Sequence, residues 1–167
     1  MDQNSNPELQ WEGKVYAKLS GPTADQAWSL LKEFCALHKW VSSIDTCYKL
    51  EGTEGEPGCV RYCAGSLNQS DPAQPVGWSK EQLVAFDPAG RSYTYKIVEG
   101  NKGFGRYTAT LRVVPDAEGV AEGCCIEWGF AAEPVRGWTC EGFVAFLAKL
   151  AQGVAARVEE EITRRRE

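Results

Sequence analysis

Apolar and polar residues alternate along residues 11–19, and the same alternation returns several times further along the chain. A period of two predicts strands that are buried on one face. The later segments with strand character are residues 46–52, 58–65, 76–87, 91–100, 103–115 and 123–134. Short stretches rich in turn residues separate most of them, which predicts hairpins and therefore a mostly antiparallel sheet of about seven strands.

Two segments have a helical pattern instead. Thr23 and Gln26 have the spacing of a capping box, which predicts that a helix, or a pair of short helices, begins there and ends near Trp40. Towards the end of the chain, apolar residues recur every three or four positions, which predicts one long helix over residues 136–166. Its apolar stripe comprises Phe143, Leu147, Leu150, Val154, Val158 and Ile162.

This order of elements predicts an α+β fold. A long sheet with one apolar face needs a cover, and the C-terminal helix is the one predicted element able to lie along it. A curved sheet wrapped around a long helix is the helix-grip fold, and the space between them is suited to a ligand. We expect residues 1–10 to form a flexible N-terminus and residues 11–167 to form a single helix-grip domain.

Charge and hydropathy narrow the classes of function. The net charge is −5, whereas a surface that binds nucleic acid needs a basic face. No apolar run has the length of a membrane span, and the first ten residues lack the apolar core of a secretion signal. We therefore expect a cytoplasmic protein that binds neither nucleic acid nor membrane. The oligomeric state is left open by the sequence.

The seven cysteines are irregularly spaced, which favours free thiols in a reducing compartment. Cys59 and Cys63 share a strand face, but four strand residues span roughly 13 Å, which is beyond the reach of a disulfide. A single histidine excludes the common multi-histidine zinc sites, and the cysteine spacings match no zinc pattern. We therefore expect no disulfide, no metal and no cofactor.

Two charged residues stand at positions where the strand patterns predict an inward direction. Arg61 lies between Cys59 and Cys63 on one face of its strand, and Glu81 lies inside another apolar strand. A buried charge costs several kcal/mol unless it is paired, so the two side chains either pair with each other or face a wet cavity. A carboxyl group can transfer a proton and an arginine can hold an oxyanion, but a purely structural ion pair is the alternative.

Eight short motifs occur in a fixed order from Trp11 to near the final helix: WEGKV, QAWSLLKEF, LHKW, GCVRY, KEQLVAFD, SYTY, YTAT and EWGF. Their order and spacing resemble the lachrymatory factor synthase family of plants, within the Bet v 1/START-like superfamily. The resemblance implies the helix-grip fold and a catalytic pair formed by Arg61 and Glu81. It also implies that Tyr95, Tyr107 and Trp128 line the substrate pocket.

The activity implied by this resemblance is a cofactor-free isomerisation, a proton-transfer rearrangement of an alkenyl sulfenic acid into a thial S-oxide. Gly77 and Leu150 stand where the family pattern has aromatic residues. Both differences remove bulk near the expected pocket, which implies a different or larger substrate. The occupant is then a small hydrophobic or sulfur-containing molecule. The alternative is a non-catalytic binding or transport protein for a small hydrophobic plant metabolite or hormone.

Overall fold

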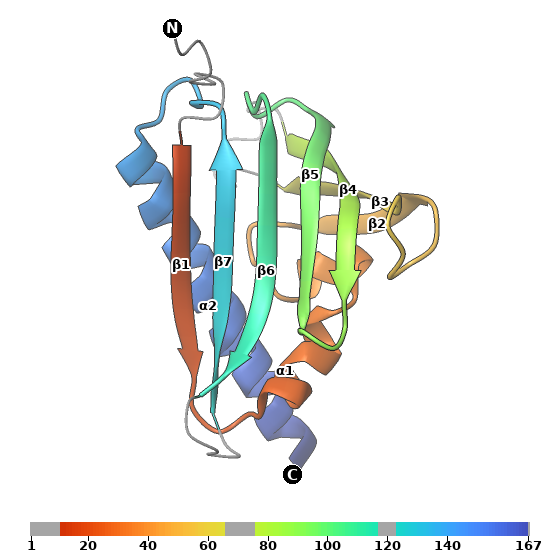
Figure 1. Ribbon diagram of the computed structural model, residues 1–167, viewed down its shortest axis with the longest axis vertical. Helices are drawn as coiled ribbons and strands as arrows, with labels where there is room; N and C mark the ends of the chain where they lie inside the picture. Colours follow the sequence, from red (N-terminus) through yellow and green to blue (C-terminus); the bar gives the residue numbers. More distant parts are fainter. Residues whose placement is uncertain (1–10, 66–75, 117–122, 167) are drawn as a thin grey trace, which may run out of the picture.

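The computed structural model describes residues 11–65, 76–116 and 123–166. The expected flexible segment 1–10 and a loop predicted at 66–75 lie outside the described residues. Within them, seven antiparallel strands form one sheet in the order β1-β7-β6-β5-β4-β3-β2, which confirms the predicted sheet (Figure 1). The strands are β1 (Trp11–Leu19), β2 (Thr46–Glu51), β3 (Val60–Gly65), β4 (Gly77–Asp87), β5 (Ser92–Gly100), β6 (Tyr107–Pro115) and β7 (Cys124–Ala132).

Two short helices follow β1, as the capping box predicts. They are α1 (Ala24–Leu31) and the 3₁₀ helix η1 (Phe34–Lys39). The Thr23 hydroxyl accepts a hydrogen bond from the Gln26 backbone N–H at 3.1 Å, and the Gln26 side-chain oxygen accepts one from the Thr23 N–H at 2.9 Å. These reciprocal bonds satisfy two donors that the first turn of a helix leaves unpaired.

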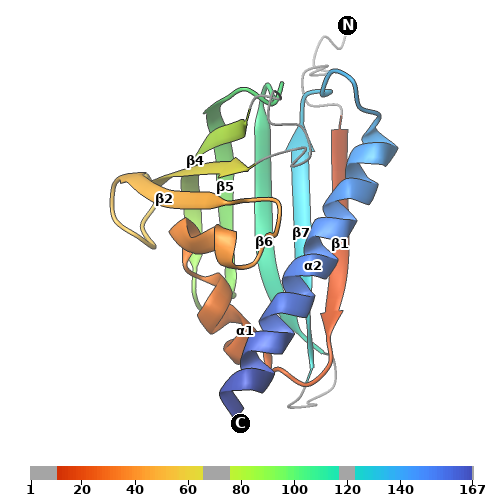
Figure 2. The same ribbon diagram turned by 180° about the vertical axis from the view of Figure 1, so that it is seen from behind.

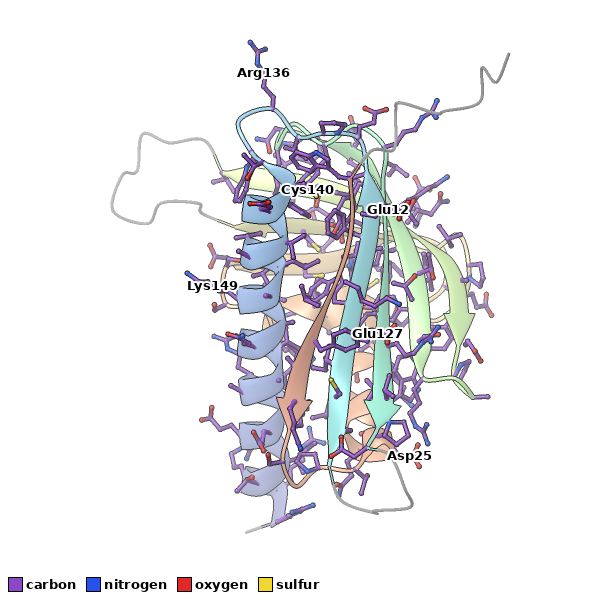
Figure 3. The ribbon with its side chains drawn as sticks, turned by 60° about the vertical axis from the view of Figure 1, so that its left-hand side comes forward. Glu12, Asp25, Glu127, Arg136, Cys140 and Lys149 are labelled. Atoms are coloured by element: carbon purple, nitrogen blue, oxygen red, sulfur yellow. The ribbon has the colours of Figure 1, made fainter. Side chains whose placement is uncertain are left out.

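The long helix α2 (Cys140–Arg166) begins four residues later than the sequence predicts. Gly137 has a positive φ of 88°, which interrupts a right-handed helix at that point. Thr139 then caps the helix, because its hydroxyl accepts a hydrogen bond from the Gly142 N–H at 2.9 Å. Figure 3 shows Arg136 on the loop that precedes the first turn of α2, where Cys140 lies.

The helices α1, η1 and α2 lie on the same face of the sheet (Figure 2). α2 runs along β1 and β7, whereas α1 lies against β6 and β7 and η1 lies against β2 and β3. The apolar stripe of α2 is buried as predicted, except that Leu150 is only half-buried. In the described part of the chain, no helix is both long and apolar enough to cross a membrane.

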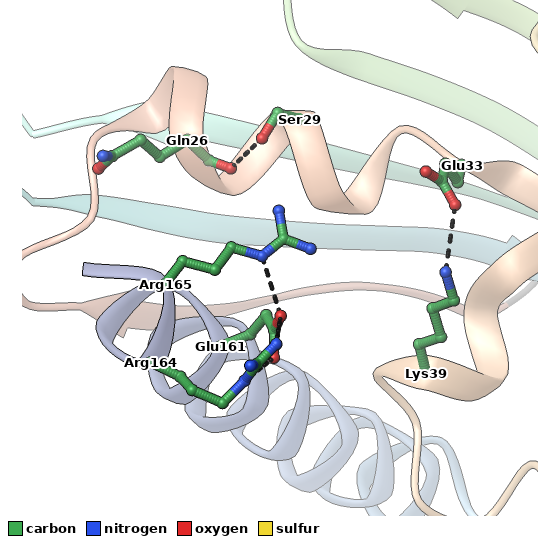
Figure 4. A network of polar contacts seen from close by, with 7 residues as sticks. All are labelled: Gln26, Ser29, Glu33, Lys39, Glu161, Arg164 and Arg165. Carbon is green, nitrogen blue, oxygen red and sulfur yellow. Dashed lines mark hydrogen bonds and ion pairs between the residues drawn. The ribbon is translucent and has the colours of Figure 1, made fainter. Parts of the chain in front are cut away.

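The charged side chains in the last turns of α2 form a small network (Figure 4). Hydrogen bonds from Arg164 and then from Arg165 lower the pKa of Glu161 to about 2. A second exposed pair joins Lys39 to Glu33 at 3.6 Å, at opposite ends of η1. Such solvent-exposed pairs contribute little to stability, so the fold depends on the buried face of the sheet.

Candidate functional site

Arg61 and Glu81 are direct neighbours across two strands. β3 and β4 are antiparallel, and their register places Arg61 opposite Glu81. Residues that oppose each other in an antiparallel pair project to the same face, so both side chains point toward the core. The two charges therefore meet across a strand pair, and not across a cavity.

Several hydrogen bonds fix the geometry of this pair. Arg61 Nε donates to Glu81 Oε1 at 2.8 Å, and Arg61 Nη2 lies 2.6 Å from the same oxygen. Arg61 Nη1 donates to the backbone carbonyl of Phe34 at 2.7 Å, and the Ser79 hydroxyl donates to Glu81 Oε2 at 3.0 Å. Arg61 is 0% exposed and Glu81 is 9% exposed, so solvent reaches the pair only from the carboxylate side.

Aromatic rings enclose the guanidinium group. Arg61 Cζ lies 3.9 Å from the centre of the Phe34 ring and 4.7 Å from that of Tyr95. Burial opposes the charge and is the largest single effect, but the Glu81 carboxylate and the smaller contributions of Tyr93, Cys63 and Tyr95 together raise the pKa of Arg61 well above its ordinary value. Arg61 is therefore a permanent cation whose role is to hold the Glu81 carboxylate in place.

A cavity of about 430 Å³ lies between the sheet and α2. Its volume is within the range of small-molecule sites, which is about 300–1,000 Å³. Most of its wall is apolar. Five residues expected at the site border this cavity, namely Glu81, Tyr95, Tyr107, Trp128 and Leu150.

Two other residues expected at the site lie behind the cavity wall. Arg61 is covered by the rings just described and does not border the cavity. Gly77 is buried in β4 opposite Gly65, and Gly65 is the residue of this pair that borders the cavity. A Cβ atom on Gly65 would lie 1.8 Å from the carbonyl oxygen of Ser43, so the close approach of the chain there excludes any side chain.

Three aromatic residues, Tyr95, Tyr107 and Trp128, bring neutral hydrogen-bond donors to the cavity wall. Burial raises the pKa of Tyr95 well above its ordinary value, with Tyr107 and then Glu81 adding to the effect. Burial, followed by the charge of Glu81, also raises the pKa of Tyr107. Both phenols therefore remain protonated. Trp128 Nε1 is buried and has no hydrogen-bond partner among the described residues, so it remains available to an acceptor on a ligand.

Three contributors to the site were not expected from the sequence. Ser79 lies two positions before Glu81 on the same strand face, so strand alternation did contain a signal for it. Trp138 and Phe146 border the cavity while remaining 44% and 38% exposed, and their ring centres are 5.3 Å apart. They form an aromatic rim at the cavity mouth. The position of Trp138 in this rim depends on how the loop before α2 packs against the helix, and no local sequence pattern predicts that packing.

Comparisons with known proteins agree with this architecture. The model of a family described as polyketide cyclase / dehydrase and lipid transport matches residues 17–164. The solved structure of the protein XoxI from Bacillus cereus is 20% identical, with a TM-score of 0.71 over 95% of this chain and 99% of that chain.

Two further solved structures resemble this chain to a similar degree. An uncharacterized protein from Bacillus thuringiensis is 21% identical, with a TM-score of 0.66 over 90% of this chain and 97% of that chain. Ginseng major latex-like protein 151 from Panax ginseng is 21% identical, with a TM-score of 0.64 over 87% of this chain and 97% of that chain. At these identities the likeness concerns the fold alone, and it confirms the predicted Bet v 1/START helix-grip fold.

Proposed function

The chain belongs to the polyketide cyclase / dehydrase and lipid transport family, and we propose that its cavity binds a small, largely hydrophobic molecule and isomerises it without a cofactor. One observation carries this proposal: a carboxylate held by Arg61 and Ser79 borders an apolar cavity. Two hydrogen bonds and one ion-pair contact use part of the acceptor capacity of this carboxylate, and its cavity side remains open to a substrate proton.

The proposed roles follow from which atoms reach the cavity. Glu81 is the group that takes a proton from the substrate and returns it at another atom. Arg61 is sealed behind the wall, so it acts as a positioning residue that orients Glu81. Stabilisation of a developing oxyanion, which the sequence analysis gave to Arg61, is assigned instead to the Tyr95 and Tyr107 hydroxyls and to Trp128 Nε1.

The specific reaction in this proposal is that of a lachrymatory factor synthase-like plant enzyme working in the cytoplasm. In an alkenyl sulfenic acid, the proton of the S–OH group leaves its oxygen and an equivalent proton is added to the far carbon of the C=C bond. The C=C π pair forms the new C–H bond at that carbon, a sulfur lone pair forms the C=S bond, and the O–H pair stays on the oxygen, which gives the thial S-oxide. Substrate and product contain the same atoms, so the step needs no oxidant, reductant or cofactor.

The test supplies the purified protein with an alkenyl cysteine sulfoxide and alliinase, and measures the thial S-oxide by gas chromatography and mass spectrometry. We expect product above the level formed without the protein. Glu81→Gln should lower the rate by about 10²–10⁴-fold, because an amide cannot carry the proton. Glu99→Gln is the matched control, since Glu99 is an exposed glutamate on β5. Equal rates for Glu81→Gln and the unmodified protein would remove Glu81 from the chemistry.

A second function, non-catalytic binding or transport of a hydrophobic metabolite or hormone, is favoured by a different observation. Arg61 is completely enclosed and its charge is already matched by Glu81, as in a structural ion pair. Native mass spectrometry of freshly purified protein tests this alternative. A co-purified ligand that Glu81→Gln still retains, together with no turnover by either protein, would favour the binding function.

A further inference from the structure

Two cysteines and a glutamate meet at a point that does not border the cavity. The Sγ atoms of Cys35 and Cys59 are 3.6 Å apart. A carboxylate oxygen of Glu54 lies within 4.8 Å of both sulfur atoms. Glu54 Oε1 also accepts a hydrogen bond from the Cys35 backbone N–H at 2.9 Å, which holds the carboxylate beside the thiols. The three residues come from η1, from the loop between β2 and β3, and from the residue before β3.

The spacing of these atoms suits a tetrahedral metal ion. Two thiolate ligands at about 2.3 Å from a tetrahedral zinc ion have sulfur atoms about 3.8 Å apart. The observed separation of 3.6 Å is close to this value, so the thiols need little movement to bind. A disulfide between the same two residues would instead require the sulfur atoms to approach by about 1.5 Å.

The local charge and exposure also favour a cation. Glu54 is exposed, Cys35 is half-buried and Cys59 is fully buried, so the cluster opens to solvent on the Glu54 side. The negative charge of Glu54 beside the two thiols attracts a divalent cation, and binding of the ion by the thiols releases their protons.

We propose that Cys35, Glu54 and Cys59 form a binding site for a zinc-type divalent ion, with a water molecule as the fourth ligand. This site is close in sequence to the residues that form or hold the Arg61–Glu81 ion pair. Cys35 follows Phe34, whose carbonyl accepts a hydrogen bond from Arg61, and Cys59 lies two residues before Arg61. The ion therefore links the segments that hold Arg61 and stabilises them together.

This proposal differs from the sequence-based expectation of no metal, because the three ligands lie far apart along the sequence. The spacings 35, 54 and 59 match no zinc pattern along the sequence, because the ligands are brought together only when η1 packs beside the start of β3. The proposal does not depend on the function assigned to the cavity, since none of the three residues borders it.

The experiment titrates the reduced, metal-free full-length protein with Zn²⁺ by isothermal calorimetry, and with Cd²⁺ by its ultraviolet sulfur-to-metal absorption. We expect one ion per chain, an absorption band typical of two thiolates, and a higher melting temperature with Zn²⁺. Cys35→Ser and Glu54→Gln should each weaken Zn²⁺ binding by at least about tenfold. Both side chains are partly or fully exposed, so neither change should prevent folding.

Cys125→Ser is the matched control, because Cys125 is another half-buried cysteine and lies on β7. Its Zn²⁺ affinity should equal that of the unmodified protein. The proposal is overturned if no saturable one-to-one binding occurs. It is equally overturned if Cys125→Ser or Cys47→Ser weakens binding as much as Cys35→Ser, since the ion would then lie at other thiols. An unchanged affinity in Glu54→Gln would reject the carboxylate as a ligand.

Discussion

Replacing Glu81 by leucine tests how strongly the buried ion pair supports the fold. In Glu81→Leu, the guanidinium of Arg61 keeps its hydrogen bond to the Phe34 carbonyl and its aromatic neighbours, but it loses the carboxylate that balances its charge. Arg61 is fully buried, so water cannot replace the lost partner without opening the core. Breaking a buried pair in this way typically lowers the free energy of unfolding by about 3–5 kcal/mol.

The contacts in the structure give a similar magnitude. Two Arg61 nitrogens contact Glu81 Oε1, at 2.8 Å and 2.6 Å. A hydrogen bond to a charged group contributes about 1.5–3 kcal/mol, and Nε makes one such bond, to which the ion-pair contact of Nη2 adds. Glu81→Gln retains an oxygen that can accept the Nε hydrogen bond, and its cost should be about half that of Glu81→Leu. The expected order of stability is therefore unmodified protein, then Glu81→Gln, then Glu81→Leu.

The assay is urea-induced unfolding at neutral pH, followed by tryptophan fluorescence and far-ultraviolet circular dichroism. The double variant Arg61→Met/Glu81→Leu should be more stable than Glu81→Leu alone, because it leaves no unpaired charge. Glu99→Gln is again the control; it removes an exposed pair with Lys80 and should cost less than about 1 kcal/mol. The single variant Arg61→Met completes the cycle. The reasoning is refuted if Glu81→Leu lowers the free energy of unfolding by less than about 1 kcal/mol, or if the cost of the double variant equals the sum of the costs of Glu81→Leu and Arg61→Met.

Three further predictions concern other parts of the molecule. Tyr107→Phe should lower the affinity of the cavity for a polar ligand about two- to tenfold, because one hydrogen bond to the ligand is lost. Calorimetry measures this affinity, and an unchanged value would contradict the role of Tyr107. Gly153→Ala should raise the free energy of unfolding by about 1 kcal/mol in urea titrations, because its Cβ meets open space in a helix, whereas Gly65→Ala should lower it, because its Cβ meets a carbonyl oxygen at 1.8 Å. A hydrogen bond from the opposing cysteine lowers the pKa of Cys47 to about 6, whereas burial raises that of Cys125. Alkylation of Cys47, followed by peptide mass spectrometry, should therefore level off above roughly pH 7 while that of Cys125 continues to rise, and parallel profiles would contradict the assignment.

The pattern of residues along the chain was sufficient for most of the fold. The alternation along residues 107–113 and the three- to four-residue spacing of α2 each define a buried face, because they reflect the local geometry of a strand or a helix. The predicted start of α2 was wrong by four residues. Gly137 adopts a left-handed conformation and Thr139 caps the helix, and a hydrophobic period does not report either effect.

The inward direction of Arg61 and Glu81 also followed from the sequence, but their contact did not. Alternation assigns a residue to a face of its own strand, whereas the register between β3 and β4 decides that these two residues oppose each other. The enclosure of Arg61 by Phe34, which separates it from the cavity, depends on where η1 packs. The meeting of Cys35 with Cys59 has the same origin. Local periodicity is a property of neighbouring residues, whereas these contacts join distant segments, so only the packing of the helices on the sheet could decide them.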